Sequence, residues 1–357
     1  MDRVFLTNTK GVEFEFIQNK DSFIVKENSN IKLSKKGDFR LIEVTKKDIS
    51  TMELVQYLSE VLKINPKDIG YAGLKDKYAT AIQFITLPKY ANIKKFKNSS
   101  RVTLKELGFV KDRLRVGKLD SNSFIITLNS VSKENYSFLE DAFNKIIKYG
   151  FANFFGYQRF GSLEENQKKA KKISLYGKGT KNQNSKILLA SYQAKFFNDW
   201  LNRRLEISKN ILEDKDDKIL KQISPTLIKE IKSTNSLFKL LPGDLGYFYK
   251  KGKKSFSITN DIKKYTNSFM EKRYHITGVL FGSNIRLSAS IAGKIEREFI
   301  DYSFDALRGA RRDAWVFVKS AKIEFDELNS KAKLFFTLPP GSYATVLLEE
   351  LLNRTFK

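Results

Sequence analysis

The chain changes character twice along its length, and this change constrains the fold more than any other feature. The first 160 residues and the last fifty contain short segments in which apolar and polar side chains alternate, as in half-buried strands. Between about residues 161 and 308, lysine-rich stretches with helical spacing dominate instead. Short alternating strands favour antiparallel pairing. We therefore expect an α+β fold, with a mostly antiparallel mixed sheet built from both ends of the chain and interrupted by a smaller inserted domain.

Several elements can be predicted individually. A helix should begin after Ser50, because Ser50 can cap it and Glu53 can complete a capping box, and it should end at Asn65-Pro66. A second helix is predicted over 133–149, with Gly150 at its C-terminal cap. Strands are predicted over 12–16, 22–26, 39–44, 82–87 and 123–128, a hairpin over 322–336, and helices over 194–205 and 345–352.

The net charge points to a polyanionic partner. Lys and Arg number 65 against 40 Asp and Glu, a formal charge of +25. Lysine-rich genome composition would also explain this excess. We favour nucleic acid, because 29 Phe and 15 Tyr offer rings on which unpaired bases can stack while the cations hold phosphates.

The absence of cysteine excludes disulfides, thiolate metal sites and cysteine nucleophiles. The single histidine, His275, cannot build a histidine-rich metal cluster, and we assign it no catalytic role. No apolar run reaches the roughly 18 to 20 residues that a membrane span needs, and the first ten residues lack the apolar core of a signal peptide. We therefore expect a cytoplasmic protein.

The segment 70–83 is the densest candidate for chemistry. It lies between the capped helix and a predicted buried strand, and Gly70 and Gly73 would allow close approach of a ligand. Asp76 follows between Lys75 and Lys77, and cations on either side would keep a carboxylate ionised for attack or proton abstraction. A charged surface turn explains the same letters, and spacing alone favours that reading.

Two other segments suit RNA. Residues 151–161 combine five aromatic side chains with one arginine and amides, which fits stacking and phosphate contact, although packing in the core is at least as good an explanation. Asn122 and Phe124 should point to the same face of a strand, where an amide and a ring could read and stack a base. Here the alternative is a turn followed by a core Phe124. Nucleoside-triphosphatase and dinucleotide-binding fingerprints are absent from the sequence.

These segments together resemble the TruD family of tRNA pseudouridine synthases. The similar segments occur in the family's order over nearly the whole chain: 23–27, 70–83 with the Lys75-Asp76 pair, 122–124, 153–161 and 338–345. The segment 277–282 is also similar, with Val279 in place of proline. The chain departs from the family at Lys20-Asp21-Ser22, where Pro-Glu-Asp is usual, and at Ile17, near which some members carry a lysine.

The resemblance implies a division of the chain and a reaction. Residues 1–161 and 308–357 would form the pseudouridine synthase catalytic domain, with an α/β TRUD-type insertion domain at 162–307. The reaction would be isomerisation of uridine to pseudouridine in tRNA, at position 13 of the D-arm, on a flipped-out base and without cofactor or metal. The partner would be tRNA, with no membrane association, and we expect a monomer.

The resemblance also implies roles for individual residues. Asp76 would be the essential carboxylate, attacking C1′ or deprotonating C2′; the sequence does not choose between these, nor does it identify the cation that faces Asp76. Substrate-binding residues would be Lys75, Asn122, Phe124, Phe23, Glu27, Gln158 and Arg159. Alternatives are an RNA-binding module or chaperone without catalysis, and the same reaction on another RNA. A methyltransferase is disfavoured, because no glycine-rich cofactor loop follows a strand.

Overall fold

The computed structural model describes residues 3–9, 11–156, 183–302 and 307–356. The chain divides into two compact units. We call Gly11–Asp141 with Val318–Gly341 the large-sheet unit, and Met1–Lys10 with Ala142–Phe317 and Ser342–Lys357 the α4 unit. The predicted site residues Gln158 and Arg159 lie outside the described residues.

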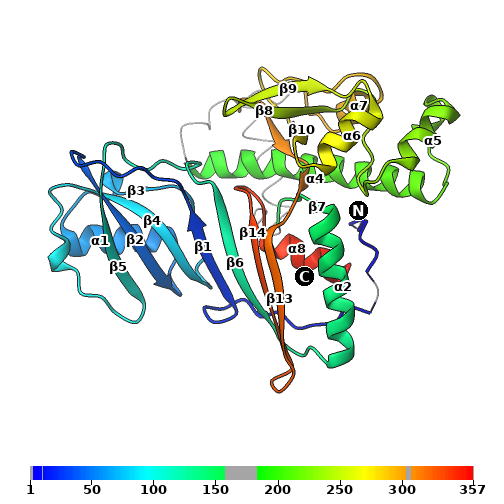
Figure 1. Cartoon of the computed structure of the whole chain (residues 1–357). Coiled ribbons are helices and arrows are strands. Elements are labelled where there is room, and N and C mark those ends of the chain that lie inside the picture. The colour runs from blue at the N-terminus through cyan, green and yellow to red at the C-terminus, as the bar shows by residue number, and fades with distance from the viewer. Residues whose placement is uncertain (1–2, 10, 157–182, 303–306, 357) are drawn as a thin grey trace. The chain divides into compact units, whose positions relative to one another are not determined.

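An eight-stranded sheet forms the large-sheet unit (Figure 1). Its strands run in the order β13-β14-β6-β1-β4-β2-β5, and β3 pairs with β4. Only the β1–β4 pair among these strands is parallel, so the expectation of a mostly antiparallel mixed sheet is confirmed. The bounds are β1 Phe23–Asn28, β2 Phe39–Lys47, β3 Gly70–Tyr71, β4 Thr80–Pro88, β5 Val102–Val110, β6 Ser121–Leu128, β13 Lys319–Asp326 and β14 Lys331–Leu338.

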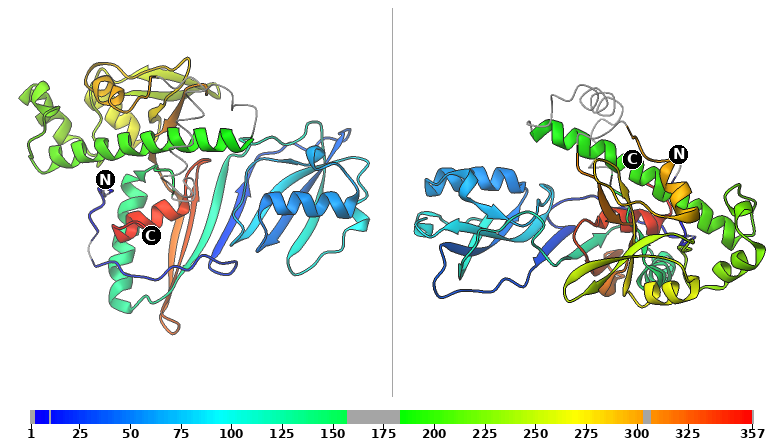
Figure 2. Two further views of the ribbon diagram at one scale, coloured as in Figure 1. Left: turned by 180° about the vertical axis from the view of Figure 1, so that it is seen from behind. Right: turned by 90° about the horizontal axis from the view of Figure 1, so that it is seen from above.

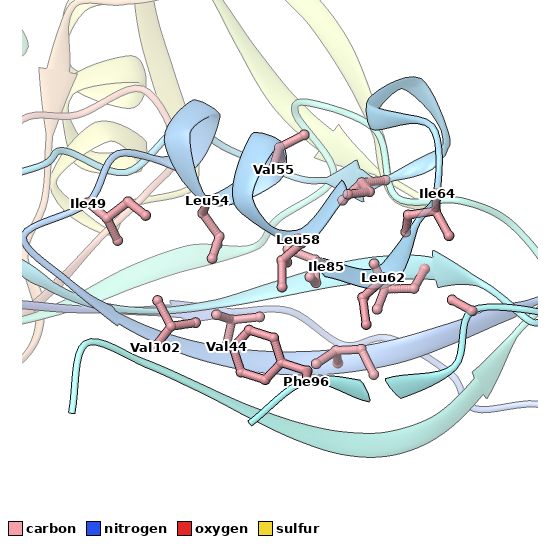
Figure 3. Packing of buried hydrophobic residues seen from close by; sticks show 14 residues of the cluster. Val44, Ile49, Leu54, Val55, Leu58, Leu62, Ile64, Ile85, Phe96 and Val102 are labelled. Atoms are coloured by element: carbon pink, nitrogen blue, oxygen red, sulfur yellow. The ribbon is translucent and has the colours of Figure 1, made fainter. Parts of the chain in front are cut away.

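Helix α1 (Thr51–Leu62) packs on one face of this sheet. The predicted start is confirmed, since Ser50 accepts from the Glu53 backbone and the Glu53 side chain accepts from the Ser50 backbone. Figure 3 shows the buried leucines of α1 lying against strand residues such as Val44 and Ile85. Burying each leucine contributes about 1.5–3 kcal/mol, and this packing holds the helix against the sheet. Short 3₁₀ turns follow at Pro66–Asp68 (η1) and Ile93–Lys95 (η2).

The α4 unit contains a long helix and a smaller sheet. Helix α2 (Lys133–Tyr149) leads into this unit with the predicted bounds, and Gly150 follows at φ +76°. Figure 2 shows α4 (Gln183–Leu212) as one long helix beside a four-stranded antiparallel sheet of order β11-β10-β8-β9. The remaining bounds are β7 Phe151–Ala152, η4 Leu220–Gln222, α5 Pro225–Ser233, β8 Leu245–Lys250, β9 Lys253–Ile258, α6 Ile262–Met270, β10 Tyr274–Leu280, α7 Ser290–Arg297, β11 Ala310–Asp313, β12 Trp315–Val316 and α8 Ala344–Leu352.

One predicted strand is wrong. Residues 12–16 form only an isolated bridge, in which Glu15 pairs with Asn129. Val12 and Phe14 are nevertheless buried, so the alternation there reflects an extended segment with one buried side. Strands β5, β8, β9 and β10 were not predicted; the last three lie in the lysine-rich part, which contains more sheet than expected. Within the described ranges, no helix combines the length and the apolar character needed to cross a membrane.

Candidate active site

Strand register brings side chains from several strands to one face of the large sheet. Cross-strand partners share a face, and Glu27 on β1 is opposite Asn122 on β6, while Val25 is opposite Phe124. The expectation that Asn122 and Phe124 point to one side is therefore confirmed. On the other flank of β1, Val25 is paired with Ala81 of β4, which is opposite Lys46 of β2. Lys46, Glu27, Asn122 and Phe124 thus lie on the face that α1 partly covers.

The loop after β3 turns Lys75 into this face. Its Nζ donates to Asn122 Oδ1 at 2.6 Å and lies 3.4 Å from Glu27 Oε2. Its backbone N–H donates to Thr51 Oγ1, at the first residue of α1, at 2.8 Å. Three predicted site residues, Lys75, Glu27 and Asn122, are thereby in direct contact. Because Lys75 is only 8% exposed, its position suits fixing the loop better than holding a phosphate.

Burial governs the ionisation of this pair. The Glu27 side chain is fully inaccessible, and Lys75 is its one ion-pair partner among the described residues. Burial raises the pKa of Glu27, and the charge of Lys75 opposes that shift. Burial also lowers the pKa of Lys75, with Glu27 and Asp76 acting in the opposite direction. Each group therefore keeps its charge largely because of the other.

Lys46 anchors the backbone of Asp76. The Lys46 side chain is fully buried at the end of β2, and its Nζ donates to the Asp76 carbonyl at 2.7 Å and to the Ile49 carbonyl at 2.5 Å. No role was predicted for Lys46. The signal was present, because the period of two that buries Ile42 and Val44 also puts Lys46 on the inner face.

The Asp76 side chain is exposed, whereas the neighbouring cations Lys46 and Lys75 are buried. Nearby protein raises the pKa of its carboxyl by excluding water from it, while Lys46 and then Lys75 lower it. The expectation that Lys77 helps hold Asp76 ionised is wrong. Lys77 points instead to Glu53, 2.8 Å from its Oε1, in a solvent-exposed pair. Among the described residues, the cations that act on Asp76 are Lys46 and Lys75.

The glycines of the loop serve packing within the protein. A Cβ on Gly70 would lie 2.3 Å from Thr86 Oγ1 and 2.7 Å from the Leu114 carbonyl, so only glycine fits there. A Cβ on Gly73 would approach Leu119 at 3.1 Å, which is tight without being excluded. Close approach was predicted for a ligand, but at Gly70 the space is filled by the protein itself, through the Thr86 side chain and the Leu114 backbone.

Phe124 lies in an aromatic cluster beside these polar groups. Its ring packs edge-on against Phe23, with centroids 5.8 Å apart, and stacks on Phe336 at 5.3 Å. Only 7% of Phe124 is exposed, and Phe23 is buried as well. In this structure both rings contribute to the core.

The described part of the segment 151–161 lies in the α4 unit and is also well packed. Asn153 donates to the Asp313 carbonyl at 2.8 Å and accepts from Arg312 Nη2 at 3.0 Å. The Arg312 guanidinium lies 3.8 Å from the ring centroid of Phe155. These contacts agree with the interpretation that the segment packs in the core. Over the described ranges, no group of three or more His, Cys, Asp or Glu side chains is arranged to hold a metal ion.

Comparison with known proteins relates this geometry to a family. The family model described as "tRNA pseudouridine synthase D (TruD)" matches residues 2–180 and 224–351. A protein named tRNA pseudouridine synthase D from Wolinella succinogenes is 33% identical over 100% of this chain and 99% of its own length. One of the same name from Nitratiruptor sp. is 35% identical over the same shares.

A solved structure shares the fold. The crystal structure of a putative tRNA pseudouridine synthase D from Methanosarcina mazei matches 99% of this chain and 97% of that chain, with a TM-score of 0.66 at 24% identity. The fold, the family model and the full-length relatives agree. The chain belongs to the TruD family of tRNA pseudouridine synthases.

Proposed function

We propose that this protein isomerises uridine to pseudouridine in tRNA and that Asp76 is its essential carboxylate. The observation that carries the proposal is the arrangement around Asp76. Its side chain is exposed, its backbone is held by Lys46, and Lys46 and Lys75 favour its ionised form. An accessible carboxylate on a fixed loop is what attack or proton abstraction at a sugar requires.

The reaction exchanges one bond to the sugar for another. The N1–C1′ bond breaks, the uracil turns, and C5 forms a bond to C1′. The hydrogen on C5 leaves as a proton and N1 gains a proton, so no oxidant or reductant is required. Positive charge that develops on the ribose is stabilised by the adjacent carboxylate, as in glycoside hydrolysis. Asp76 acts either by attack on C1′ or by removal of the C2′ proton.

The surrounding residues have distinct roles in this proposal. Lys75, Glu27 and Asn122 form the contact that holds the loop, and Asn122 also faces the substrate. Phe124, supported by Phe23, remains our candidate for the ring that meets the uracil. Gln158 and Arg159, outside the described residues, remain predicted tRNA contacts. The target base must leave its stack to reach Asp76.

The finer assignments are part of the same proposal. We assign the modified nucleotide to position 13 of the D-arm, the protein to the cytoplasm, and the active form to a monomer that needs no cofactor. We also propose that residues 1–161 with 308–357 act as the catalytic domain and that residues 162–307 are an insertion that helps to hold the tRNA. The names of the relatives support tRNA as the substrate class.

Tritium release tests the proposal. Unmodified tRNA labelled with ³H at uridine C5 is incubated with the wild-type protein and with Asp76→Asn, without added cofactor. We expect release by the wild type only, with equal tRNA affinity for both proteins. Mapping of the modified nucleotide then tests position 13.

Two outcomes would count against it. Release by Asp76→Asn at the wild-type rate would remove Asp76 from the chemistry. Tight binding of several tRNAs without release by the wild type would favour an RNA-binding module, and release from another RNA alone would change the substrate.

A further inference from the structure

The sheet of the α4 unit carries aromatic rings on one face, next to a lysine-rich turn. Strands β8 and β9 are joined through Lys251 and Gly252, both at positive φ, as in the tight turns that favour hairpins. Lys250, Lys251, Lys253 and Lys254 are all exposed. Four cations within five residues, on one tight turn, form a local site of strong positive potential.

The rings beside this turn come from three neighbouring strands. Tyr247 is opposite Phe256 on β9 and His275 on β10, so these side chains share a face. Tyr249 follows two residues along β8 and therefore points the same way. We call Tyr247, Tyr249, Phe256 and His275 the aromatic face. The opposite face meets α4, because a Cβ on Gly278 of β10 would lie 2.0 Å from the Trp200 ring.

Within the aromatic face, the Tyr249 ring is oriented by its neighbours and exposed to solvent. Tyr247 and His275 are stacked, with centroids 4.8 Å apart and 6° between their planes. Tyr249 packs edge-on against both, at 5.3 Å and 5.5 Å, yet remains 57% exposed. An aromatic ring that is oriented by its neighbours and open to solvent can accept a nucleobase with little loss of side-chain freedom.

The charges around the aromatic face are arranged for an anion. Asp313 accepts a hydrogen bond from the Tyr247 hydroxyl at 3.0 Å and lies 3.8 Å from Lys254 Nζ. Lys254 Nζ also lies 4.0 Å from the Tyr247 ring centroid. At the far side, the exposed Arg286 lies 5.7 Å from the Phe256 ring centroid. Asp313 is thus paired with Lys254, while Lys250, Lys251, Lys253 and Arg286 are exposed and have no carboxylate partner among the described residues.

We propose that the β8–β9 hairpin is a binding site for unpaired RNA, in which a nucleobase stacks on Tyr249 and the lysines of the turn contact the adjoining phosphates. Charge complementarity and an exposed aromatic ring favour RNA over an acidic protein segment, since the latter would not need a stacking surface. The inference rests on the proposed function for the identity of the partner, the tRNA. It adds a second contact, with loop nucleotides, to that at the catalytic carboxylate.

The first experiment measures affinity for unmodified tRNA by fluorescence anisotropy, using the full chain. Tyr249→Ala should weaken binding by about 5- to 150-fold, the range for loss of one stacked base, and Tyr249→Phe should retain affinity. Tyr302→Ala is the matched control, since Tyr302 is a tyrosine of the same unit that is even more exposed, at 69%. It should leave affinity unchanged.

The second experiment separates stacking from charge. A blunt RNA duplex offers phosphates without unpaired loop bases, so Tyr249→Ala should bind it as the wild type does. The triple variant Lys250→Gln, Lys251→Gln and Lys253→Gln should weaken binding to both RNAs. It should also reduce the salt dependence by about 0.7 to 0.9 per lost phosphate contact. Lys263→Gln with Lys264→Gln, on exposed α6 lysines, is its control.

The outcomes are distinguishable from failure of the proposed function. Equal tRNA affinity for the wild type and Tyr249→Ala overturns the inference, whether or not pseudouridine forms, and would leave the hairpin to a protein partner. Equal losses on tRNA and on duplex also overturn the stacking contact. Binding that depends on Tyr249 without any tritium release would support this site while removing the isomerase.

Discussion

Lys46 and Asp76 are thirty residues apart in sequence, yet the buried ammonium of one donates to the main-chain carbonyl of the other at 2.7 Å. The same ammonium also donates to the carbonyl of Ile49. Asp76 therefore stands on a backbone that is fixed from beneath by strand β2. The bond leaves its carboxylate exposed for chemistry and sets its position relative to the sheet.

Replacement of Lys46 should uncouple the loop from the sheet. In Lys46→Met the carbonyls of Ile49 and Asp76 lose their donor, while the cost of a buried charge disappears. We expect little net change in the free energy of unfolding, because these effects oppose each other. The value of kcat should fall by about 10- to 100-fold as the carboxylate shifts. Faster hydrogen exchange over residues 72–79 would accompany the loss; unchanged kcat would show that the anchor has no role in turnover.

The ionisation of Lys46 should appear in the pH profile. Burial lowers the pKa of Lys46 to about 8. We expect kcat/KM to decline as pH rises through about 8, because the neutral amine donates a weaker hydrogen bond to the Asp76 carbonyl and no longer carries a charge beside the carboxylate. Between about pH 8 and about pH 10.5, Lys46 in the folded state binds fewer protons than in the unfolded state, so its contribution to stability rises with pH over this range. Unfolding through Lys46 therefore cannot cause the decline.

Arginine at position 46 provides the control for that profile. The guanidinium stays protonated well above pH 10, so in Lys46→Arg the decline should move to higher pH if the variant folds. Deprotonation of the uracil itself would affect both proteins equally. The same midpoint near pH 8 in both proteins would assign the titration to another group.

The Lys75–Glu27 pair should behave as a unit in stability measurements. Lys75→Met leaves the Glu27 carboxylate buried without a cation, which should lower the free energy of unfolding by about 3–5 kcal/mol. Adding Glu27→Gln should recover part of this loss, because no buried charge remains. Both tryptophans, Trp200 and Trp315, lie in the α4 unit, whereas hydrogen exchange over residues 23–28 and 121–128 reports on this pair directly. An additive double variant would argue against coupling.

Features that depend on neighbouring residues could be predicted from the sequence. The Ser50–Glu53 capping box and the bounds of helix α2 depend on neighbouring residues, and both occur as expected. The shared face of Asn122 and Phe124 also followed from the period of a strand. These features need no knowledge of how distant segments meet.

The contacts that form the site could not be predicted from the sequence, because they join distant segments. Glu27, Lys75 and Asn122 meet only through the order of β1, β4 and β6 and the path of the loop. Lys46 appeared as one more lysine in a lysine-rich chain, and Lys77 looked as good a neighbour for Asp76 as any. The β8–β9 hairpin was missed in the same way, since the lysine-rich part was expected to be mainly helical and the Lys251-Gly252 turn was not recognised.

Phe124 tests whether a core ring also meets the substrate. Phe124→Ala should cost about 3–5 kcal/mol of stability through the cavity that it leaves, so loss of activity in that variant would be ambiguous. Phe124→Leu retains most of the volume and removes the ring. Phe336→Leu is the matched control, since Phe336 stacks on Phe124 at 5.3 Å and is buried in the same cluster.

If the uracil contacts Phe124, the two leucine variants should differ in turnover at similar stability. We expect Phe124→Leu to lower kcat by about 5- to 150-fold, the range for one lost base stack, and Phe336→Leu to stay within a few-fold of the wild type. Single-turnover tritium release at saturating tRNA measures this, with thermal unfolding as the check on folding. Equal losses in both variants would restrict Phe124 to the core, since a ring that only supports the sheet should not affect turnover more than its buried neighbour does.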